Sequence, residues 1–140
     1  MILLDSNVLS EFMHDRPDIR VIGWLDRQPR TSVWTTSISV FEIRFGLQTM
    51  PMGKRRASLM LFFERLLSDT IQGRIAVFDH AAAEQAAELA AMRKNKGRPG
   101  ELRDTLIAGI VLASHATLAT RNVKHFEDIT SSVINPWEKS

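Results

Sequence analysis

The sequence predicts an α/β fold, in which a central, mainly parallel sheet is flanked by helices on both faces. At 140 residues, the chain has the usual size of a single domain. Short apolar runs typical of buried strands alternate with longer stretches in which apolar residues recur at helical spacing. Strands separated by helices are joined by right-handed crossovers, which produces parallel pairing. We therefore expect residues 1–140 to form one domain.

The first half of the chain contains two predicted strands and three predicted helices. Pro51 and Gly53 separate the second helix from the third, and Gly73 ends the third. Residues rich in β-forming types mark the second strand. The predicted elements are, in order, a strand at 2–4, a helix over about 19–25, a strand at 32–36, a helix over about 39–50 and a helix from 54 to 72.

The second half continues the alternation. Asp79 precedes an alanine-rich stretch and is expected to cap its helix. Gly97, Pro99 and Gly100 predict a loop after that helix. The predicted elements are a strand at 75–78, a helix over about 80–96, a helix over 102–114, a strand at 116–120 and a short strand at 133–134.

Composition narrows the chemistry. The chain has no cysteine, so disulfides and thiolate metal sites are excluded, and any metal must bind oxygen or imidazole. No apolar stretch reaches the roughly 18 residues that span a bilayer, so we expect a cytoplasmic protein without a membrane segment. A net charge of +2 and a pI of about 9.4 permit a polyanionic partner without requiring one.

Basic residues gather in two segments. Either segment is explained equally well by solvated helix ends or by phosphate contacts. The segments contain Arg93, Lys94, Lys96, Arg98 and Arg103 in one, and Lys54, Arg55 and Arg56 in the other.

Four polar residues, Asp5, Glu42, Asp104 and Asn122, lie next to the ends of predicted elements. In a parallel sheet the ligand crevice lies outside the carboxyl ends of the strands, where Asp5 and Asn122 are placed. Each residue also has a structural alternative. Asp5 could cap the following helix, and Glu42 matches a capping box with Ser39. The negative charge of Asp104 could be there because the dipole of its helix stabilises it, and Asn122 could form a turn.

The joint occurrence of these four residues favours a shared site over four separate structural roles. Several acids that converge on one crevice repel one another unless a cation compensates them. Oxygen ligands favour Mg²⁺, with Mn²⁺ as a substitute, over zinc. The four histidines lack zinc-binding spacing, and no phosphate loop, nucleophile elbow or dinucleotide fingerprint is present. The carboxylates remain as the candidate chemistry.

Five short motifs resemble those of PIN-domain ribonucleases, especially VapC-type toxins of the FitB-like branch. Together they extend over nearly the whole chain in the order of that family. They are residues 1–11 (MILLDSNVLSE), 41–46 (FEIRFG), 103–109 (RDTLIAG), 118–126 (LATRNVKHF) and 134–137 (INPW).

The resemblance implies roles for particular residues. Asp5, Glu42 and Asp104 match the acidic triad and would bind Mg²⁺, while Asn122 occupies a fourth position that holds aspartate or asparagine. Glu42 would position or deprotonate the attacking water. Substrate contacts are expected from Ser6, Asn7, Thr120 and Arg121. At position 125 a histidine replaces an acid common in relatives, and no role is assigned to it.

The resemblance also implies partners. It implies an RNA substrate, a cognate antitoxin whose basic residue would enter the acidic crevice, a homodimer, and a larger toxin–antitoxin assembly held on operator DNA by the antitoxin. Two alternatives remain open. One is a non-catalytic module that binds nucleic acid or a partner chain. The other is a phosphoacceptor receiver domain, which the single acid of the first strand and the lack of a late lysine disfavour.

Overall fold

The computed structural model describes residues 1–138 and confirms the α/β prediction. Within these residues a five-stranded parallel sheet has the order β3-β2-β1-β4-β5. The central strand β1 therefore has β2 on one side and β4 on the other. The strands are β1 (Ile2–Leu4), β2 (Val33–Thr36), β3 (Ile75–Ala76), β4 (Thr117–Ala119) and β5 (Val133–Ile134).

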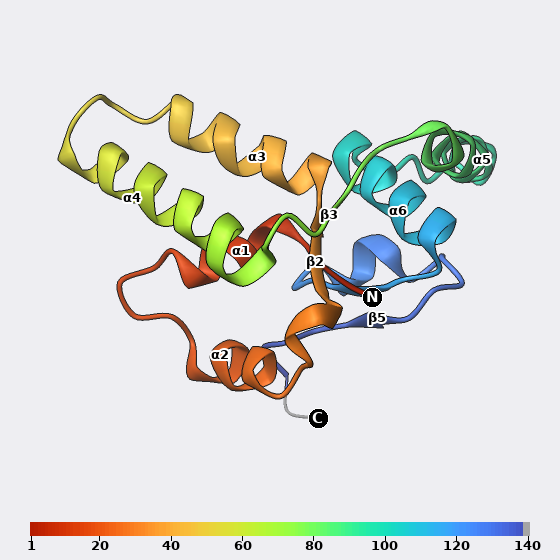
Figure 1. The fold of residues 1–140 in the computed structure, drawn as a ribbon. Coiled ribbons are helices and arrows are strands. Elements are labelled where there is room, and N and C mark those ends of the chain that lie inside the picture. Colours follow the sequence, from red (N-terminus) through yellow and green to blue (C-terminus); the bar gives the residue numbers. More distant parts are fainter. Residues whose placement is uncertain (139–140) are drawn as a thin grey trace.

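Helices cover both faces of this sheet (Figure 1). The helices α3 and α4 lie side by side, and α5 packs extensively along α6. The α-helices are α1 (Ser6–Phe12), α2 (Ile19–Asp26), α3 (Ser37–Gln48), α4 (Lys54–Arg65), α5 (His80–Asn95) and α6 (Leu102–Ser114). Shorter turns are the 3-10 helices η1 (Arg30–Ser32) and η3 (Val123–Phe126) and the π-helix η2 (Leu66–Ile71). No helix among the described residues is long and apolar enough to cross a membrane.

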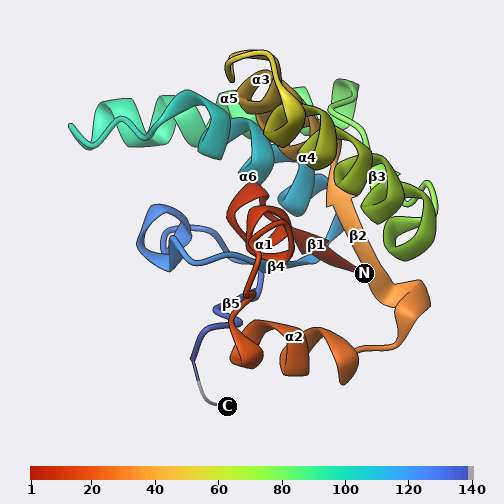
Figure 2. The ribbon, with the colours of Figure 1, turned by 90° about the vertical axis from the view of Figure 1, so that its left-hand side faces the viewer.

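Two hydrophobic cores lie on opposite faces of the sheet. Successive side chains of a strand point to opposite faces, so Leu4 packs into one core and Leu3 into the other. The Leu4 core gathers residues of α1 to α4, such as Val8 and Phe63. The Leu3 core gathers residues of α5 and α6, such as Ile107. Figure 2 shows α5 and α6 on one side of the sheet and α2 on the other.

Helices α5 and α6 approach closely at Gly109. A Cβ added there would lie 2.5 Å from the Ala82 carbonyl oxygen and 2.7 Å from the Ala86 Cβ. Only a residue without a side chain fits this crossing. The close packing holds α6 against α5, and the first turn of α6 carries Asp104.

The structure corrects several predicted boundaries. Helix α3 begins at Ser37 and not at 39, because Thr36 caps it. Strand β3 ends at Ala76, since the Phe78 amide leaves the ladder and donates to Ser37 Oγ. The predictions did not include α1 or η3 as elements, because each spans only two turns or fewer. The predicted cap Asp79 is confirmed, with Oδ1 accepting from the Ala82 amide at 2.9 Å.

Candidate active site

Three neighbouring strands end at the edge of the sheet that carries the predicted acids. Asp5 follows β1 and Thr120 follows β4, while β2 leads into α3, which carries Glu42. The Asp5 amide extends the ladder by donating to the Ala119 carbonyl at 2.9 Å. The order of the sheet therefore brings residues more than a hundred positions apart into one site.

Asp5 is held by a dense set of hydrogen bonds. Its Oδ1 accepts from the Ser6 amide at 2.7 Å, and its Oδ2 accepts from Thr120 Oγ1 at 2.7 Å and from Asn7 Nδ2 at 3.2 Å. The residue is only 2% exposed. Burial raises the pKa of Asp5, and the nearby charge of Asp104 raises it further, although the hydrogen bonds oppose both. Asp5 thus caps α1 and also belongs to the acidic site.

Glu42 is not the helix cap that its spacing to Ser39 suggested. Thr36 caps α3 instead, with Oγ1 accepting from the Ser39 amide at 3.0 Å. Glu42 Oε2 accepts a long hydrogen bond of 3.4 Å from Ser6 Oγ. Its Oε1 is buried and has no hydrogen-bond partner within residues 1–138.

The electrostatic setting of Glu42 follows from that placement. Burial, followed by the charge of Asp5, raises the pKa of Glu42 to about 7, against a smaller lowering by Arg103. Buried polar atoms without partners are rare in folded proteins. The Oε1 atom of Glu42 therefore lacks a donor or a cation among residues 1–138.

Asp104 lies in the first turn of α6 without capping it. Glu101 supplies that cap by accepting from the Asp104 amide at 3.0 Å. The Asp104 Oδ2 pairs with His125 Nδ1 at 2.6 Å. The charge of Asp104 raises the pKa of both Asp5 and Glu42, which places all three acids within one electrostatic neighbourhood.

His125 is the residue that sequence reasoning missed. It lies in η3, three positions after Asn122, and its amide donates to the Asn122 carbonyl at 3.0 Å. That turn returns the imidazole to Asp104. Two signals were available in the sequence, a short polar turn after a strand end and a histidine where relatives commonly have an acid. Neither shows which way the side chain points.

The remaining predicted residues divide between support and exposure. Thr120 and Asn7 hold Asp5, and the Asn122 amide donates to Thr120 Oγ1 at 3.1 Å. The Asn122 side chain is exposed and makes no hydrogen bond in the described part of the chain. The Arg121 amide donates to Asn7 Oδ1 at 3.1 Å, but its guanidinium lies over the Trp137 ring, 4.9 Å from the centroid.

The arrangement constrains how a metal could bind. Within residues 1–138, no three His, Asp or Glu side chains stand close enough together to hold an ion directly. The orphaned Oε1 of Glu42 and the repulsion among the acids nonetheless suit a hard cation. Mg²⁺ keeps several waters and commonly uses only one or two carboxylates. The residues therefore fit a Mg²⁺ ion held partly through water.

The chain is similar to known proteins in its sequence and in its fold. The model of the PIN domain matches residues 2–130. The chain is 40% identical to the plasmid stability protein StbB of Pseudomonas syringae pv. tomato and 38% identical to the VapC ribonuclease Y4jK of Sinorhizobium fredii. Both matches cover 99% of each chain. A structure of FitAB bound to the IR36 DNA fragment contains a chain with a TM-score of 0.90 and 33% identity, covering 100% of this chain and 98% of the other.

Proposed function

The chain belongs to the PIN-domain family, and on that premise we propose that it is an endoribonuclease acting as the toxin of a toxin–antitoxin pair. One relative of similar length is named a VapC ribonuclease. The observation that carries the proposal is the buried, unpartnered Glu42 Oε1 beside Asp5. A carboxylate cluster without its own cation is costly to fold, and a site for a cation and a polyanion accounts for it.

We propose Mg²⁺ as the cofactor, with Mn²⁺ as a substitute. Asp5, Asp104 and Glu42 would hold the ion, directly or through water. When bound, the ion lowers the pKa of water and neutralises charge that develops on the phosphate. Asparagine at position 122 adds no full charge, so a second strongly held ion is not part of this proposal.

The residues of the chain have separate roles in this scheme. Glu42 accepts the proton of the attacking water at Oε1, the atom that has no hydrogen-bond partner among residues 1–138. Thr120 and Asn7 orient Asp5 through their hydrogen bonds. Ser6 and the exposed Asn122 side chain contact the substrate or its water, and Arg121 contributes its backbone to this edge.

The function is tested by incubating the purified chain with single-stranded RNA in the presence of Mg²⁺. We expect cleavage that EDTA abolishes and Mn²⁺ restores, and mapping the new RNA ends identifies the site. For variants of the acidic residues of the site, the matched control is Asp26→Asn, because Asp26 is exposed and lies at the end of α2. Absence of cleavage by a chain whose stability responds to Mg²⁺ would contradict the ribonuclease assignment.

A non-catalytic binding module remains the second candidate. The observation that favours it is the absence, within residues 1–138, of three acidic or histidine side chains close enough to hold an ion directly. This candidate predicts that Mg²⁺ and Mn²⁺ change neither the chemical shifts nor the stability of the purified chain. A metal-dependent change accompanied by metal-dependent cleavage of RNA excludes it.

We propose that a cognate antitoxin inhibits the site. Its arginine or lysine would pair with Asp5, Glu42 and Asp104 in place of the metal. The apolar surface it needs is available in a groove among α1, α3 and α4 that contains Met13, Leu47 and Leu59 and has Glu42 in its wall. By analogy with the FitAB complex on DNA, the antitoxin would hold a homodimer of this chain on operator DNA.

The antitoxin proposal is tested by co-purifying the chain with the product of the adjacent gene. Each basic residue of that partner is then replaced by alanine. We expect one replacement to relieve inhibition while binding persists, because affinity rests on the apolar contacts. If every variant still inhibits, control is not exerted at the acidic crevice.

A further inference from the structure

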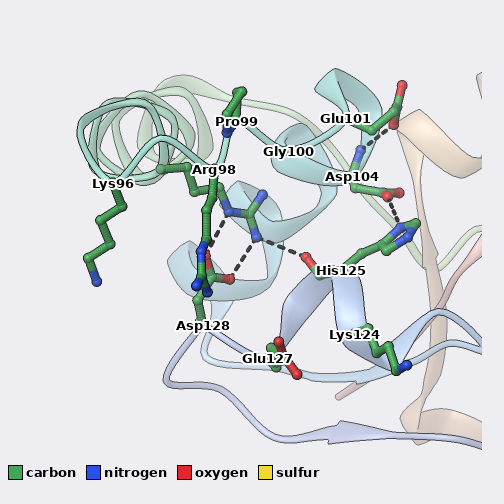
Figure 3. A pocket seen from close by; sticks show the side chains of 11 residues that line it. Lys96, Arg98, Pro99, Gly100, Glu101, Asp104, Lys124, His125, Glu127 and Asp128 are labelled. Atoms are coloured by element: carbon green, nitrogen blue, oxygen red, sulfur yellow. Dashed lines mark hydrogen bonds and ion pairs between the residues drawn. The ribbon is translucent and has the colours of Figure 1, made fainter.

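A cavity of about 390 Å³ adjoins the acidic site on the side away from Asp5. It lies between η3 and the loop that joins α5 to α6, and we call it the α5–α6 pocket. Asp104 and His125 line one end of it (Figure 3). Lys96, Arg98 and Lys124 also line it. The pocket therefore continues from the proposed catalytic acids into a region of mixed charge that contains three exposed basic side chains.

The back wall of the pocket is fixed by Arg93, which is 4% exposed. Its guanidinium donates to both oxygens of Asp128 at 2.8 Å, to the His125 carbonyl at 2.9 Å and to Thr105 Oγ1 at 3.0 Å. Gly100 packs onto it so closely that a Cβ there would lie 2.6 Å from Nη1. One buried residue thus joins α5, α6 and the segment after η3, which gives the pocket a defined shape.

Besides His125, the pocket is lined by as many basic as acidic side chains, but the two kinds are not equally free to meet a ligand. The basic ones are Arg93, Lys96, Arg98 and Lys124, and the acidic ones are Glu101, Asp104, Glu127 and Asp128. The carboxylate of Asp128 is bound by Arg93, and that of Asp104 is paired with His125. Glu101 accepts from the Asp104 amide. In contrast, Lys96, Arg98 and Lys124 form no ion pair within residues 1–138, and all three are exposed. Glu101 and Glu127 are exposed as well, so three cations and two carboxylates are left to meet a ligand. The cations are in excess by one, which favours a phosphate over a cationic ligand.

The size of the pocket limits the ligand. Its volume falls at the small end of the range for ligand cavities, about 300–1,000 Å³. This is room for one nucleotide unit and not for a folded RNA. Unpaired strands can splay single nucleotides into such pockets, whereas a duplex cannot. The position next to Asp104 puts the occupant one step along the strand from the proposed point of cleavage.

We propose that the α5–α6 pocket binds the nucleotide adjoining the scissile phosphate of a single-stranded RNA, with Lys96, Arg98 and Lys124 contacting its phosphate. The proposal rests on the proposed ribonuclease function and adds a substrate-binding site to it. Arg93 and Arg103, although members of the basic segment in sequence, are excluded from this contact. Arg93 is buried in its ion pair, and the Arg103 guanidinium lies over the rings of Phe41 and Phe45.

The test measures binding separately from cleavage. A short fluorescein-labelled oligouridylate is titrated in EDTA, and its fluorescence anisotropy gives the Kd at several salt concentrations. The variants are Lys124→Gln and the double variant Lys96→Gln with Arg98→Gln. The matched control is Lys94→Gln, because Lys94 lies on the same exposed end of α5 but does not line the pocket.

The pocket variants should weaken binding several-fold, and the salt dependence of log Kd should fall by about 0.7 for each phosphate contact removed. The Lys94 control should bind like the wild type. Unchanged binding and unchanged cleavage in the pocket variants would overturn the proposal while leaving the ribonuclease function intact. A wild-type chain that binds through the pocket but never cleaves would contradict the function alone. A wild-type chain that neither binds nor cleaves RNA would overturn both.

Discussion

The carboxylates near Asp104 fall into two groups, Asp128 in the first and Asp5 with Glu42 in the second. The surroundings of the two groups shift the carboxyl pKa in opposite directions. Asp128 receives two hydrogen bonds from the buried Arg93, which lowers the pKa of Asp128. Asp5 and Glu42 have no such cation, and burial raises the pKa of both. The first group is electrostatically complete within the chain and joins three segments. The second group has no paired cation among residues 1–138, which is consistent with the cation site that we propose.

The difference separates a structural ion pair from a candidate catalytic site. Acids in a fold are not informative by themselves, since carboxylates occur in both groups. The informative quantity is the balance of charge around each one. Substitutions that change the balance of charge around Asp5 and Glu42 can therefore be compared with substitutions that change it around Asp128.

Ribonuclease activity should show the largest effect. Asp5→Asn or Asp104→Asn should lower it by more than about 100-fold, because changes that only touch the outer shell of a metal site already cost 10–100-fold. Without metal, the stability of Asp104→Asn should equal or slightly exceed that of the wild type, since repulsion among the acids is relieved. Asp5→Asn should be folded but somewhat less stable, because an amide nitrogen cannot accept the hydrogen bonds that a carboxylate oxygen of Asp5 accepts. Activity and urea unfolding are measured on the same samples. A variant that is inactive only because it is unfolded would refute this reading.

The Arg93 ion pair should show the largest effect on stability. Arg93→Ala leaves Asp128, Thr105 and the His125 carbonyl without their donor, and we expect a loss of about 3 kcal/mol in the free energy of unfolding. The partial exposure of Asp128 keeps the loss at the low end of the range for buried pairs. Arg93→Lys keeps the charge but not the paired geometry, so its loss should be smaller. Urea denaturation of Arg93→Ala showing less than about 1 kcal/mol would mean that the pair is not structural.

The pH dependence of stability should distinguish the two groups by sign. Between about 4.5 and 7, Glu42 is protonated in the folded chain and ionised in the unfolded one, so stability falls as pH rises through this window. Asp5 acts in the same direction. Asp128, whose pKa is lowered, acts in the opposite direction at lower pH, where stability is lost as pH falls.

Glu42→Gln removes the Glu42 contribution. In EDTA at pH 8 the variant should be more stable than the wild type by about 1 kcal/mol or less, after discounting for solvent screening of a half-exposed group. At pH 4 the two should agree. Urea unfolding at both pH values checks the prediction, which is wrong if the variant is the less stable chain at pH 8.

The smallest effect concerns Asn122. Asn122→Asp adds a carboxylate to the exposed rim of the acidic group and should tighten Mn²⁺ binding a few-fold, since a hard cation prefers a charged oxygen. Calorimetric titration measures the affinity. Equal or weaker binding would show that Asn122 does not face the metal.

The sequence specified the fold better than the site. Apolar periodicity located α6 at its observed bounds, and the alternation of strands and helices predicted the parallel sheet. The acids were found because the carboxyl ends of parallel strands converge. Local patterns were less reliable. Ser39 and Glu42 match a capping box, yet Thr36 is the cap, because α3 begins directly after β2 ends at Thr36.

Tertiary contacts account for what the sequence could not specify. Arg93 reads as one cation in a solvated run, and only the return of the chain to Asp128 buries it. His125 reads as a surface histidine until η3 turns it toward Asp104. The Arg121 guanidinium lies over the Trp137 ring, a contact that the sequence does not show, and its expected contact with substrate stays a prediction. Each outcome depends on a residue far away in the chain.

The most direct test of the account is the response of stability to a divalent cation. The midpoint of thermal unfolding is measured in EDTA and at increasing Mg²⁺ or Mn²⁺, for the wild type, Asp5→Asn and Asp26→Asn. We predict that the wild type and Asp26→Asn gain stability with metal concentration as ligand binding to the folded state requires, and that Asp5→Asn gains much less. An equal gain in all three chains, or no gain in the wild type, would contradict the claim that the Asp5, Glu42 and Asp104 group is a cation site.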